Sequence, residues 1–375
     1  GAGGAGGAGL AGGVYVVRHN GSLNLITLRY RLRDAAIRGA KAPFTIGKDE
    51  FPAGSLLVPA SDRARDAIVA LGLQATAVAA APEVETVDVD LPRLAVYTTW
   101  ANTEKVGWVR LAFDRWEIPF DLIHKDHVRS GANLRSKYDV IVVPHQTQGG
   151  RALVYEQPRL SKPLAYRKND RFKSLGMYAE TDDVRGGMGL EGVLEFERFV
   201  RDGGLLMTFG VASFFPAEFG LARGVEASRG QGTWYAPGPY VQTEILRPDH
   251  PVLYGYAGTT LPVRWADGPL LTVPMANPEM AAFIGSTPER PVVLARYQGG
   301  DAGVLSGLLR GADQLRNRPA LVETTLGNGR VLLYTMNPIY RWQTFGEHGL
   351  VFNALLYWND LPTAPAQPSA PSGGR

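Results

Sequence analysis

The residues that could do chemistry begin with a turn in the middle of the chain. Residues 203–213 read Gly-Gly-Leu-Leu-Met-Thr-Phe-Gly-Val-Ala-Ser, which predicts a buried strand, a tight glycine turn and a helix. Such a turn can hold a catalytic nucleophile at the carboxyl end of a central strand. The nucleophile position is Ala212, which has no reactive group, and the chain has no cysteine that could replace it. The pattern therefore predicts an enzyme-like scaffold without this nucleophile.

Ser213 follows this position and is the nearest hydroxyl. A serine hydrolase needs Gly-x-Ser-x-Gly, whereas the chain reads Val-Ala-Ser-Phe-Phe here. We expect the Ser213 hydroxyl to cap the following helix rather than to attack a substrate.

Histidines and paired carboxylates are the other candidates for chemistry. None of the six histidines begins a His-x-x-Glu zinc motif. His124 and His127 have a spacing that could bind metal on a helix, but the segment reads as a turn, so we expect neither a metal site nor a cofactor there. Asp182 and Asp183 could act as catalytic carboxylates if the protein were an enzyme of unrecognised mechanism. Alternatively, they could cap a helix that begins near Gly189.

Polar residues at one predicted strand end form a candidate ligand site. His145, Gln146, Thr147 and Gln148 follow a strand that ends at Pro144. Doubly wound folds bind ligands at the carboxyl edge of the sheet, so these residues are in a suitable place. Ordinary loop polarity explains them as well.

The strongest functional signal is a basic segment, residues 151–175. It contains seven basic and two acidic residues, while the whole chain carries a net charge of only +3. Aromatic residues are interleaved with the cations, which suits docking on an acidic protein surface or on anionic lipid. A solvated, self-paired loop is the alternative. The candidate binding residues are Arg151, Tyr155, Arg159, Lys162, Tyr166, Arg167, Lys168, Arg171 and Lys173.

A second candidate surface is the Pro/Gly-rich stretch 230–240. Trp234 and Tyr235 lie in it, and exposed aromatic residues on a stiff loop make good anchors at interfaces or sugar sites. Buried packing is the alternative.

The elements that must position these residues predict a doubly wound α/β architecture. Residues 94–97, 120–123, 138–143, 205–209 and 331–336 read as strands, and helical patterns alternate with them. The predicted organisation is a flexible linker at 1–13, a small α/β module at 14–90, a large α/β domain at 91–361 and a disordered tail at 362–375. Within the large domain we expect a long loop at 145–187 and a β-rich insertion at 221–291. Leu190, Val193, Leu194 and Val200 are expected on the buried face of one helix.

Composition excludes several classes of function. The absence of cysteine excludes disulfides, thiolate metal sites and thiol catalysis. The small net charge and the lack of a recognisable nucleic-acid-binding motif argue against a nucleic-acid partner. No apolar run approaches the ~20 residues that a membrane-spanning helix needs. Because the chain begins at Gly1 rather than Met, we expect a processed product or a fragment.

The turn and a late strand together resemble the class I glutamine-amidotransferase-like fold. In that family the turn carries cysteine, and a His-Pro-Glu element follows a late strand. Here the late strand at 333–336 is followed by Asn337-Pro338-Ile339, so Asn337 replaces the base and Ile339 the residue that orients it. The resemblance therefore implies a flavodoxin-like scaffold whose catalytic triad is lost.

A further resemblance covers almost the whole chain. The chain is similar to the C-terminal, non-catalytic region of exported M14 zinc carboxypeptidase family proteins, with the peptidase domain absent. The matching segments are Phe51–Ser55, Leu164–Lys168, Asp182–Gly192, Tyr340–Gly346 and Phe352–Leu355. The resemblance implies a small α/β module followed by an amidotransferase-like domain.

These features lead to two hypotheses about function. The first is a non-catalytic binding or scaffold protein that acts as an accessory subunit of a larger periplasmic or secreted assembly. This assembly could be associated with a membrane. Its partner would be a protein with an acidic surface or a membrane complex, with an anionic lipid surface as an alternative. The second hypothesis is a recognition or regulatory fragment of a secreted zinc carboxypeptidase.

Overall fold

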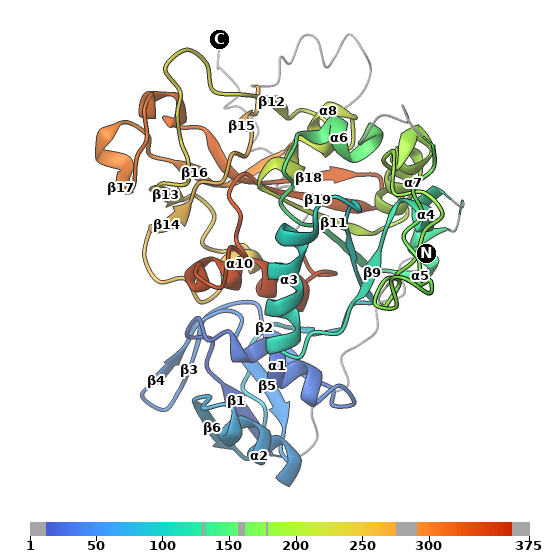
Figure 1. The fold of residues 1–375 in the computed structure, drawn as a ribbon. Coiled ribbons are helices and arrows are strands. Elements are labelled where there is room, and N and C mark those ends of the chain that lie inside the picture. The colour runs from blue at the N-terminus through green and yellow to red at the C-terminus, as the bar shows by residue number, and fades with distance from the viewer. Residues whose placement is uncertain are drawn as a thin grey trace, which may run out of the picture.

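The computed structural model describes residues 13–129, 131, 133–156, 162–177, 179–274 and 291–361. It is a mixed α/β protein with a mainly parallel central sheet and a smaller N-terminal module below it (Figure 1). The predicted tail and all of the predicted linker except Gly13 lie outside the described residues, as do residues 275–290 of the predicted insertion.

The N-terminal module is built on an antiparallel sheet with the strand order β6-β1-β5-β2-β7 and a separate β3-β4 hairpin. Its helix α2 is capped by Ser61, whose hydroxyl accepts a hydrogen bond from the Ala64 amide at 3.1 Å. The elements are β1 (Val14–Val17), α1 (Asn24–Arg31), β2 (Arg38–Ala40), β3 (Phe44–Ile46), β4 (Asp49–Phe51), β5 (Leu56–Pro59), α2 (Asp62–Ala70), β6 (Ala75–Val78) and β7 (Thr86–Asp88).

The parallel part of the large sheet positions the candidate sites. It contains β8 (Leu94–Tyr97), β9 (Asp121–Ile123), β10 (Val140–Val143), β11 (Leu205–Phe209) and β19 (Gly329–Tyr334). Numbered along the chain, these strands lie side by side in the order 2-1-3-4-5, a doubly wound order. The order reverses between β8 and β10, so the connections leaving these two strands run to opposite sides. This reversal makes the carboxyl ends of β8 and β10 the switch point of the sheet.

Antiparallel strands continue the sheet beyond β19. They follow in the order β18 (Pro319–Leu326), β16 (Val292–Tyr297), β13 (Tyr240–Ile245) and β14 (Thr260–Arg264), and β17 (Val304–Ser306) also pairs with β13. The predicted β-rich insertion is therefore not a separate layer, since β13 and β14 extend the main sheet. A small pair, β12 (Glu226–Ser228) and β15 (Leu270–Thr272), stands apart.

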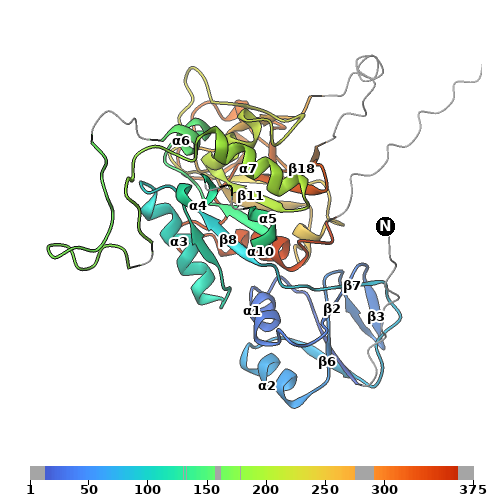
Figure 2. The ribbon, with the colours of Figure 1, turned by 90° about the vertical axis from the view of Figure 1, so that its right-hand side faces the viewer.

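Helices cover both faces of the parallel strands. In β10, Val140 and Val142 belong to the core cluster that includes α3 and α10, whereas Ile141 and Val143 belong to the cluster that includes α7. This alternation produces three layers, which Figure 2 shows from the side. The helices are α3 (Thr103–Arg115), α4 (Lys125–Arg129), α5 (Leu134–Lys137), α6 (Gly150–Tyr155), α7 (Gly189–Arg201), α8 (Phe214–Glu218) and α10 (Phe345–Leu356), with short 3-10 turns η1 (Gly210–Ser213), η2 (Pro251–Leu253), η3 (Asp301–Gly303) and η4 (Ala312–Leu315).

The predicted buried face of α7 is wrong in part. Val193 and Val200 are buried, but Leu190 and Leu194 are 57% and 60% exposed. Glu195 takes a buried place on this helix, because its carboxylate accepts a hydrogen bond from the Leu134 amide at 2.8 Å. The helix is thus rotated relative to the face that its leucines suggest.

The N-terminal module is held against the closing helix α10. The His19 imidazole Nε2 lies 3.0 Å from the Asn353 amide oxygen, and both side chains are buried. The Tyr357 hydroxyl donates to the Gly54 carbonyl at 2.9 Å. The core on the α3–α10 side of the sheet consequently continues into the module without a break.

Candidate functional site

The predicted turn after β11 forms, but it lacks the geometry of a strained nucleophile. Gly210 has a φ of +54°, and a Cβ there would lie 2.2 Å from His145 Nδ1, so only glycine fits. The Gly210 amide donates to the Met336 carbonyl at 2.9 Å, which brings the turn beside the end of β19. Ala212 has no positive φ and is completely buried. A nucleophile elbow instead exposes its reactive residue on a strained backbone.

The other positions of the expected triad are also buried. Asn337 is 3% exposed and Ile339 is 1% exposed, so neither faces solvent beside the turn. His145 accepts a hydrogen bond from the Val211 amide at 3.3 Å. Burial lowers the pKa of His145 from 6.5 to about 3, and it is therefore neutral at physiological pH.

The expected helix cap by Ser213 is wrong. Ser213 does occupy the residue before α8, but its side chain makes no cap hydrogen bond. The hydroxyl lies 2.8 Å from the Tyr334 carbonyl and 2.9 Å from the Thr208 carbonyl, and it is fully buried. The Ser213 hydroxyl thus bonds to carbonyls of β11 and β19 and links these two strands. Because it is buried and engaged there, this hydroxyl is not available to attack a substrate.

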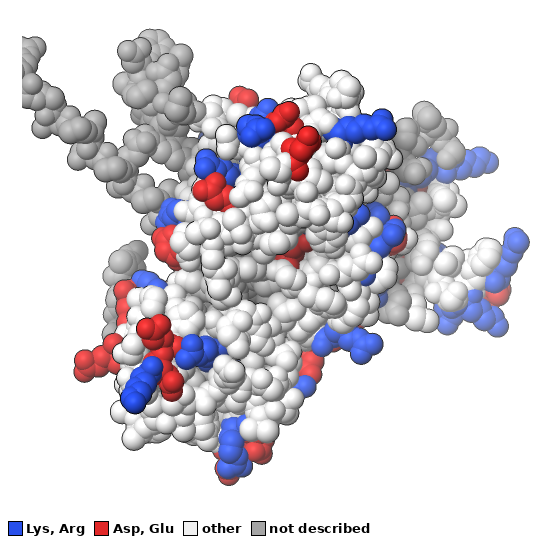
Figure 3. Space-filling view, turned by 90° about the vertical axis from the view of Figure 1, so that its left-hand side faces the viewer, with Lys and Arg blue, Asp and Glu red and all other residues white. Residues whose placement is uncertain are grey.

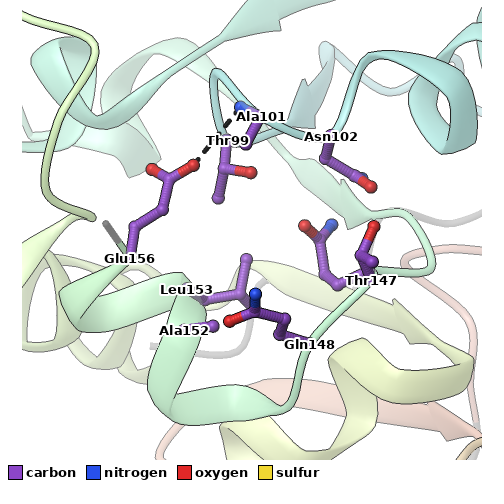
Figure 4. A pocket seen from close by; sticks show the side chains of 9 residues that line it. Thr99, Ala101, Asn102, Thr147, Gln148, Ala152, Leu153 and Glu156 are labelled. Carbon is purple, nitrogen blue, oxygen red and sulfur yellow. Dashed lines mark hydrogen bonds between the residues drawn. The ribbon is translucent and has the colours of Figure 1, made fainter. Parts of the chain in front are cut away.

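A pocket of about 370 Å³ lies at the switch point of the sheet. We call it the switch-point pocket. Figure 4 shows side chains that converge on it from three elements. Its lining comes from the loop after β8 (Thr99, Ala101, Asn102), the loop after β10 (Gln146–Gln148) and α6 with its end (Ala152, Leu153, Glu156). The predicted residues Gln146, Thr147 and Gln148 therefore do lie at a cavity, while His145 is not among its lining residues and accepts a hydrogen bond from the Val211 amide.

Asn102 occupies the N-cap position of α3 but does not cap the helix with its side chain. Its amide Nδ2 donates to the His145 carbonyl at 3.0 Å, which links the loops after β8 and β10. The Asn102 Oδ1 atom is buried and has no hydrogen-bond partner among the described residues. Asn102 is only 3% exposed, so this acceptor is buried beside the pocket and is not satisfied by the described residues.

Glu156 faces the pocket from the opposite side (Figure 4). It ends α6 with a φ of 38°, unusual for a residue with a side chain. Glu156 Oε1 accepts a hydrogen bond from the Ala101 amide at 3.3 Å, whereas Oε2 is buried without a partner in the described part of the chain. Burial raises the pKa of Glu156, while hydrogen bonding to the Ala101 amide and the Thr99 side chain and the positive charge of Lys125 partly oppose this shift.

A larger groove of about 660 Å³ adjoins the switch-point pocket and shares Ala101 and Glu156 with it. We call it the aromatic groove, and the two cavities together the composite site. Trp100, Tyr166 and Phe172 supply the rings, Leu164 and Val184 supply aliphatic surface, and Arg185 contributes a guanidinium group. The Trp100 ring stacks on His124 at a centroid distance of 4.1 Å and lies 5.3 Å from Tyr166.

Residues 162–175 of the basic segment contribute to this groove and lie in a loop that stands out from the body of the protein (Figure 2). Tyr166 and Phe172 line the groove, and they are 37% and 49% exposed. Arg167 pairs with Asp182. Figure 3 shows lysine and arginine side chains gathered on this projection, toward its right-hand side. Lys162, Lys168, Arg171 and Lys173 are exposed as well.

Of the remaining predicted binding residues, two lie on α6, two lie on the antiparallel side of the sheet, and one is not described. Arg151 and Tyr155 lie on α6, with the guanidinium 6.0 Å from the centre of the ring. Arg159 lies outside the described residues. Trp234 packs against Trp265 at 5.4 Å and Tyr235 pairs with Arg310, so both lie on the antiparallel side of the sheet. The structure therefore does not bring Trp234 and Tyr235 into the composite site.

The two predicted aspartates have structural partners. Asp183 accepts hydrogen bonds from the Arg185 side chain at 2.8 and 2.7 Å and from the Leu164 amide at 3.2 Å. The Arg185 guanidinium holds the pKa of Asp183 far below its ordinary value. Helix α7 does begin at Gly189, but Met188 precedes it and neither aspartate caps it. The two aspartates instead tie residues 164–167 of the basic segment to residues 181–185, which return to the body of the protein.

His124 and His127 do not form a metal site with the residues that the structure describes. The segment is the short helix α4 rather than the predicted turn, and His127 Nδ1 accepts a hydrogen bond from the His124 amide at 3.1 Å. No third histidine or carboxylate joins them within the described ranges. No helix in these ranges has the length and apolar character needed to cross a membrane.

Sequence reasoning missed Trp100, Asn102, Glu156 and Arg185 as site residues. One signal was present, since residues 99–102 follow a predicted strand just as residues 145–148 do. The carboxyl ends of neighbouring parallel strands share one edge of the sheet. Residues 99–102 could therefore also have been predicted as part of the ligand site.

Comparisons with known proteins give only distant likenesses. No protein-family model matches the chain, and no curated protein matches it significantly. A β-galactosidase from Bacillus circulans sp. alkalophilus is 15% identical over 74% of this chain with a TM-score of 0.40, and the chain spans only 32% of that protein. A putative ThuA-like protein from Bacteroides uniformis is 14% identical over 72% of this chain and 92% of its own, with a TM-score of 0.39. A putative GMP synthase component from Thermoplasma acidophilum is 8% identical over 71% of this chain and 95% of its own, with a TM-score of 0.39. At this level of similarity, none of them carries information about the activity of this chain.

Proposed function

We propose that this chain is a non-catalytic binding or scaffold protein on a flavodoxin-like, amidotransferase-like scaffold. In this proposal it is an accessory subunit of a larger extracytoplasmic assembly, and it binds through the composite site at the sheet's switch point. The observation that carries the proposal is the pair of adjoining cavities, lined by buried polar atoms that the described protein leaves without partners.

The turn after β11 supports a binding rather than a catalytic role. Its nucleophile position is the buried Ala212, and the buried Asn337 and Ile339 stand where a base and its orienting group would be needed. The nearest hydroxyl, that of Ser213, is held by two strand carbonyls. The side chains beside the turn thus provide packing rather than proton transfer.

The charge of the basic segment supports a partner with an acidic surface. Lys168, Arg171 and Lys173 are exposed, and none of the three makes an ion pair within the described ranges. Exposed cations beside exposed aromatic rings combine electrostatic steering with apolar contact area.

The test is the size of the native particle. The protein is extracted gently from the cells that produce it and sized, and we expect it to elute in a complex. The variant Arg171→Glu/Lys173→Glu should release it, whereas Arg33→Glu/Lys48→Glu makes the same charge change on exposed residues of the N-terminal module and should not. A monomer in the unmodified extract would contradict the proposal.

A further inference from the structure

Side chains that line the composite site carry three buried polar atoms with unused hydrogen-bonding capacity. They are Asn102 Oδ1, Glu156 Oε2 and Arg185 Nη1, and none has a partner among the described residues. Asn102 and Arg185 are only 3% and 9% exposed. An unsatisfied buried polar group is destabilising, so each one in a native structure needs an explanation. Three such atoms around two adjoining cavities indicate a ligand that supplies their partners.

The chemistry of these atoms restricts the ligand. The two oxygens accept hydrogen bonds and the guanidinium donates, so the ligand must carry both a donor and an acceptor. Arg185 is already neutralised by its two bonds to Asp183, and Glu156 lies in the field of Lys125. The site therefore does not require a strong charge at its centre. A peptide group offers an N–H and a carbonyl and is itself neutral.

The aromatic groove specifies an apolar side chain rather than a sugar. A sugar ring carries hydroxyl groups around its whole edge, whereas the groove is lined mainly by apolar residues, with Glu156, Asn169 and Arg185 as the polar side chains among the described ones. One face of the Trp100 ring is also occupied, because it stacks on His124 at a centroid distance of 4.1 Å. Leu164, Phe172 and Val184 surround the remaining space with hydrocarbon. The cavity volumes of about 370 and 660 Å³ lie in the range of natural ligand pockets.

Charge at the rim specifies what flanks the apolar residue. Lys168, Arg171 and Lys173 belong to the same segment that supplies Tyr166 and Phe172 to the groove. These cations are sequence neighbours of groove residues, so we expect a segment bound in the groove to lie in their electrostatic field. Acidic residues on either side of the apolar one would be attracted, and basic residues would be repelled.

We propose that the composite site binds a short acidic peptide segment of a partner protein, with one apolar side chain in the aromatic groove. A peptide N–H donates to Asn102 Oδ1 or Glu156, and a peptide carbonyl accepts from Arg185 Nη1. The inference rests on the proposed binding function and adds the class of ligand to it.

The probe is a library of fluorescent hexapeptides that are acidic at their outer positions and varied at the two central positions. Fluorescence anisotropy measures binding to the full chain at low and at physiological salt. We expect members with central Leu or Phe to bind about tenfold more tightly than members with central Ser. Salt should weaken the binding.

Matched variants locate the binding on the chain. Phe172→Ser should weaken the best peptide at least about fivefold, whereas Tyr235→Ser, at an equally exposed ring outside the site, should leave it unchanged. Glu156→Gln, which retains the shape of the side chain, should also weaken it. Circular dichroism of each variant verifies that it is folded.

The outcomes separate this inference from the proposed function. Absence of binding by every library member, or equal loss in Phe172→Ser and Tyr235→Ser, would overturn the peptide site. Binding to anionic vesicles that depends on the cations but not on Phe172 would also overturn it, and would identify a lipid surface instead. In either case a native complex that depends on Arg171 and Lys173 would leave the proposed binding function standing.

Discussion

Protonation of His19 should loosen the attachment of the N-terminal module to α10. The ring is 3% exposed, donates from Nε2 to Asn353 at 3.0 Å and accepts at Nδ1 from the Gly21 amide at 3.4 Å. A second proton would be placed on Nδ1, opposite an N–H group that already donates to it. Burial therefore lowers the pKa of His19 from 6.5 to about 4.

The sign and size of the effect follow from linkage. Above the unfolded pKa neither state binds the proton, and the full stability is present. As the pH falls below that value, the unfolded chain takes up a proton that the folded chain does not, so stability is lost down to the folded pKa. Between about pH 7.5 and about pH 5 the loss attributable to His19 is about 2 kcal/mol.

Urea unfolding of the wild type and of His19→Gln, at both pH values, measures this quantity. Glutamine still offers a donor to Asn353 but has no proton to gain, so the fall in stability between the two pH values should be about 2 kcal/mol smaller in the variant. His127→Gln makes the same change on α4, at an exposed histidine, and controls for the substitution itself. An equal pH dependence in wild type and His19→Gln would refute the reasoning.

Three further predictions concern the turn, the module and the basic segment. Gly210→Ala should destabilise the protein by at least about 2 kcal/mol more than Gly47→Ala in thermal unfolding. Both glycines have a positive φ, but only at Gly210 would the added Cβ clash, with His145. Equal effects of the two substitutions would contradict the packing described at the turn. Tyr357→Phe should cost about 1 kcal/mol in urea unfolding, because it removes the hydrogen bond to the Gly54 carbonyl; an unchanged midpoint would show that this bond contributes nothing. Asp183→Asn should accelerate trypsin cleavage in the basic segment, because it weakens the hydrogen bonds from Arg185 and Leu164. Asp170→Asn, at an exposed residue, should leave the cleavage rate unchanged. Equal cleavage rates in the two variants would mean that Asp183 does not hold the segment in place.

Continuous apolar runs made much of the parallel sheet predictable. Residues 94–97 and 205–209 are strands with the expected bounds, because strands covered on both faces need no polar alternation. The late strand is β19, two residues earlier than expected at its end, since Thr335 and Met336 follow the strand. The face of α7 was mispredicted because burial of Glu195 depends on the Leu134 amide, 61 residues away.

The candidate site was only half predictable, for a related reason. Gln146–Gln148 could be placed at the carboxyl edge from their position after a strand alone. Asn102 resembled an ordinary helix cap, and its role depends on a hydrogen bond to the His145 carbonyl in another loop. Glu156 reaches the pocket through an unusual φ at the end of α6. Contacts between loops are a property of the assembled sheet and leave no local pattern.

The attachment of the module to α10 has a consequence for how the chain folds. His19 and Asn353 are 334 positions apart in the sequence, and the contact between them closes almost the whole chain into one loop. Closing so long a loop is entropically unfavourable until other contacts have formed. During synthesis the module leaves the ribosome before the large domain does, and α10 leaves it after the other elements of that domain. The surface of the module that contacts α10 therefore remains uncovered until translation of the large domain is nearly complete.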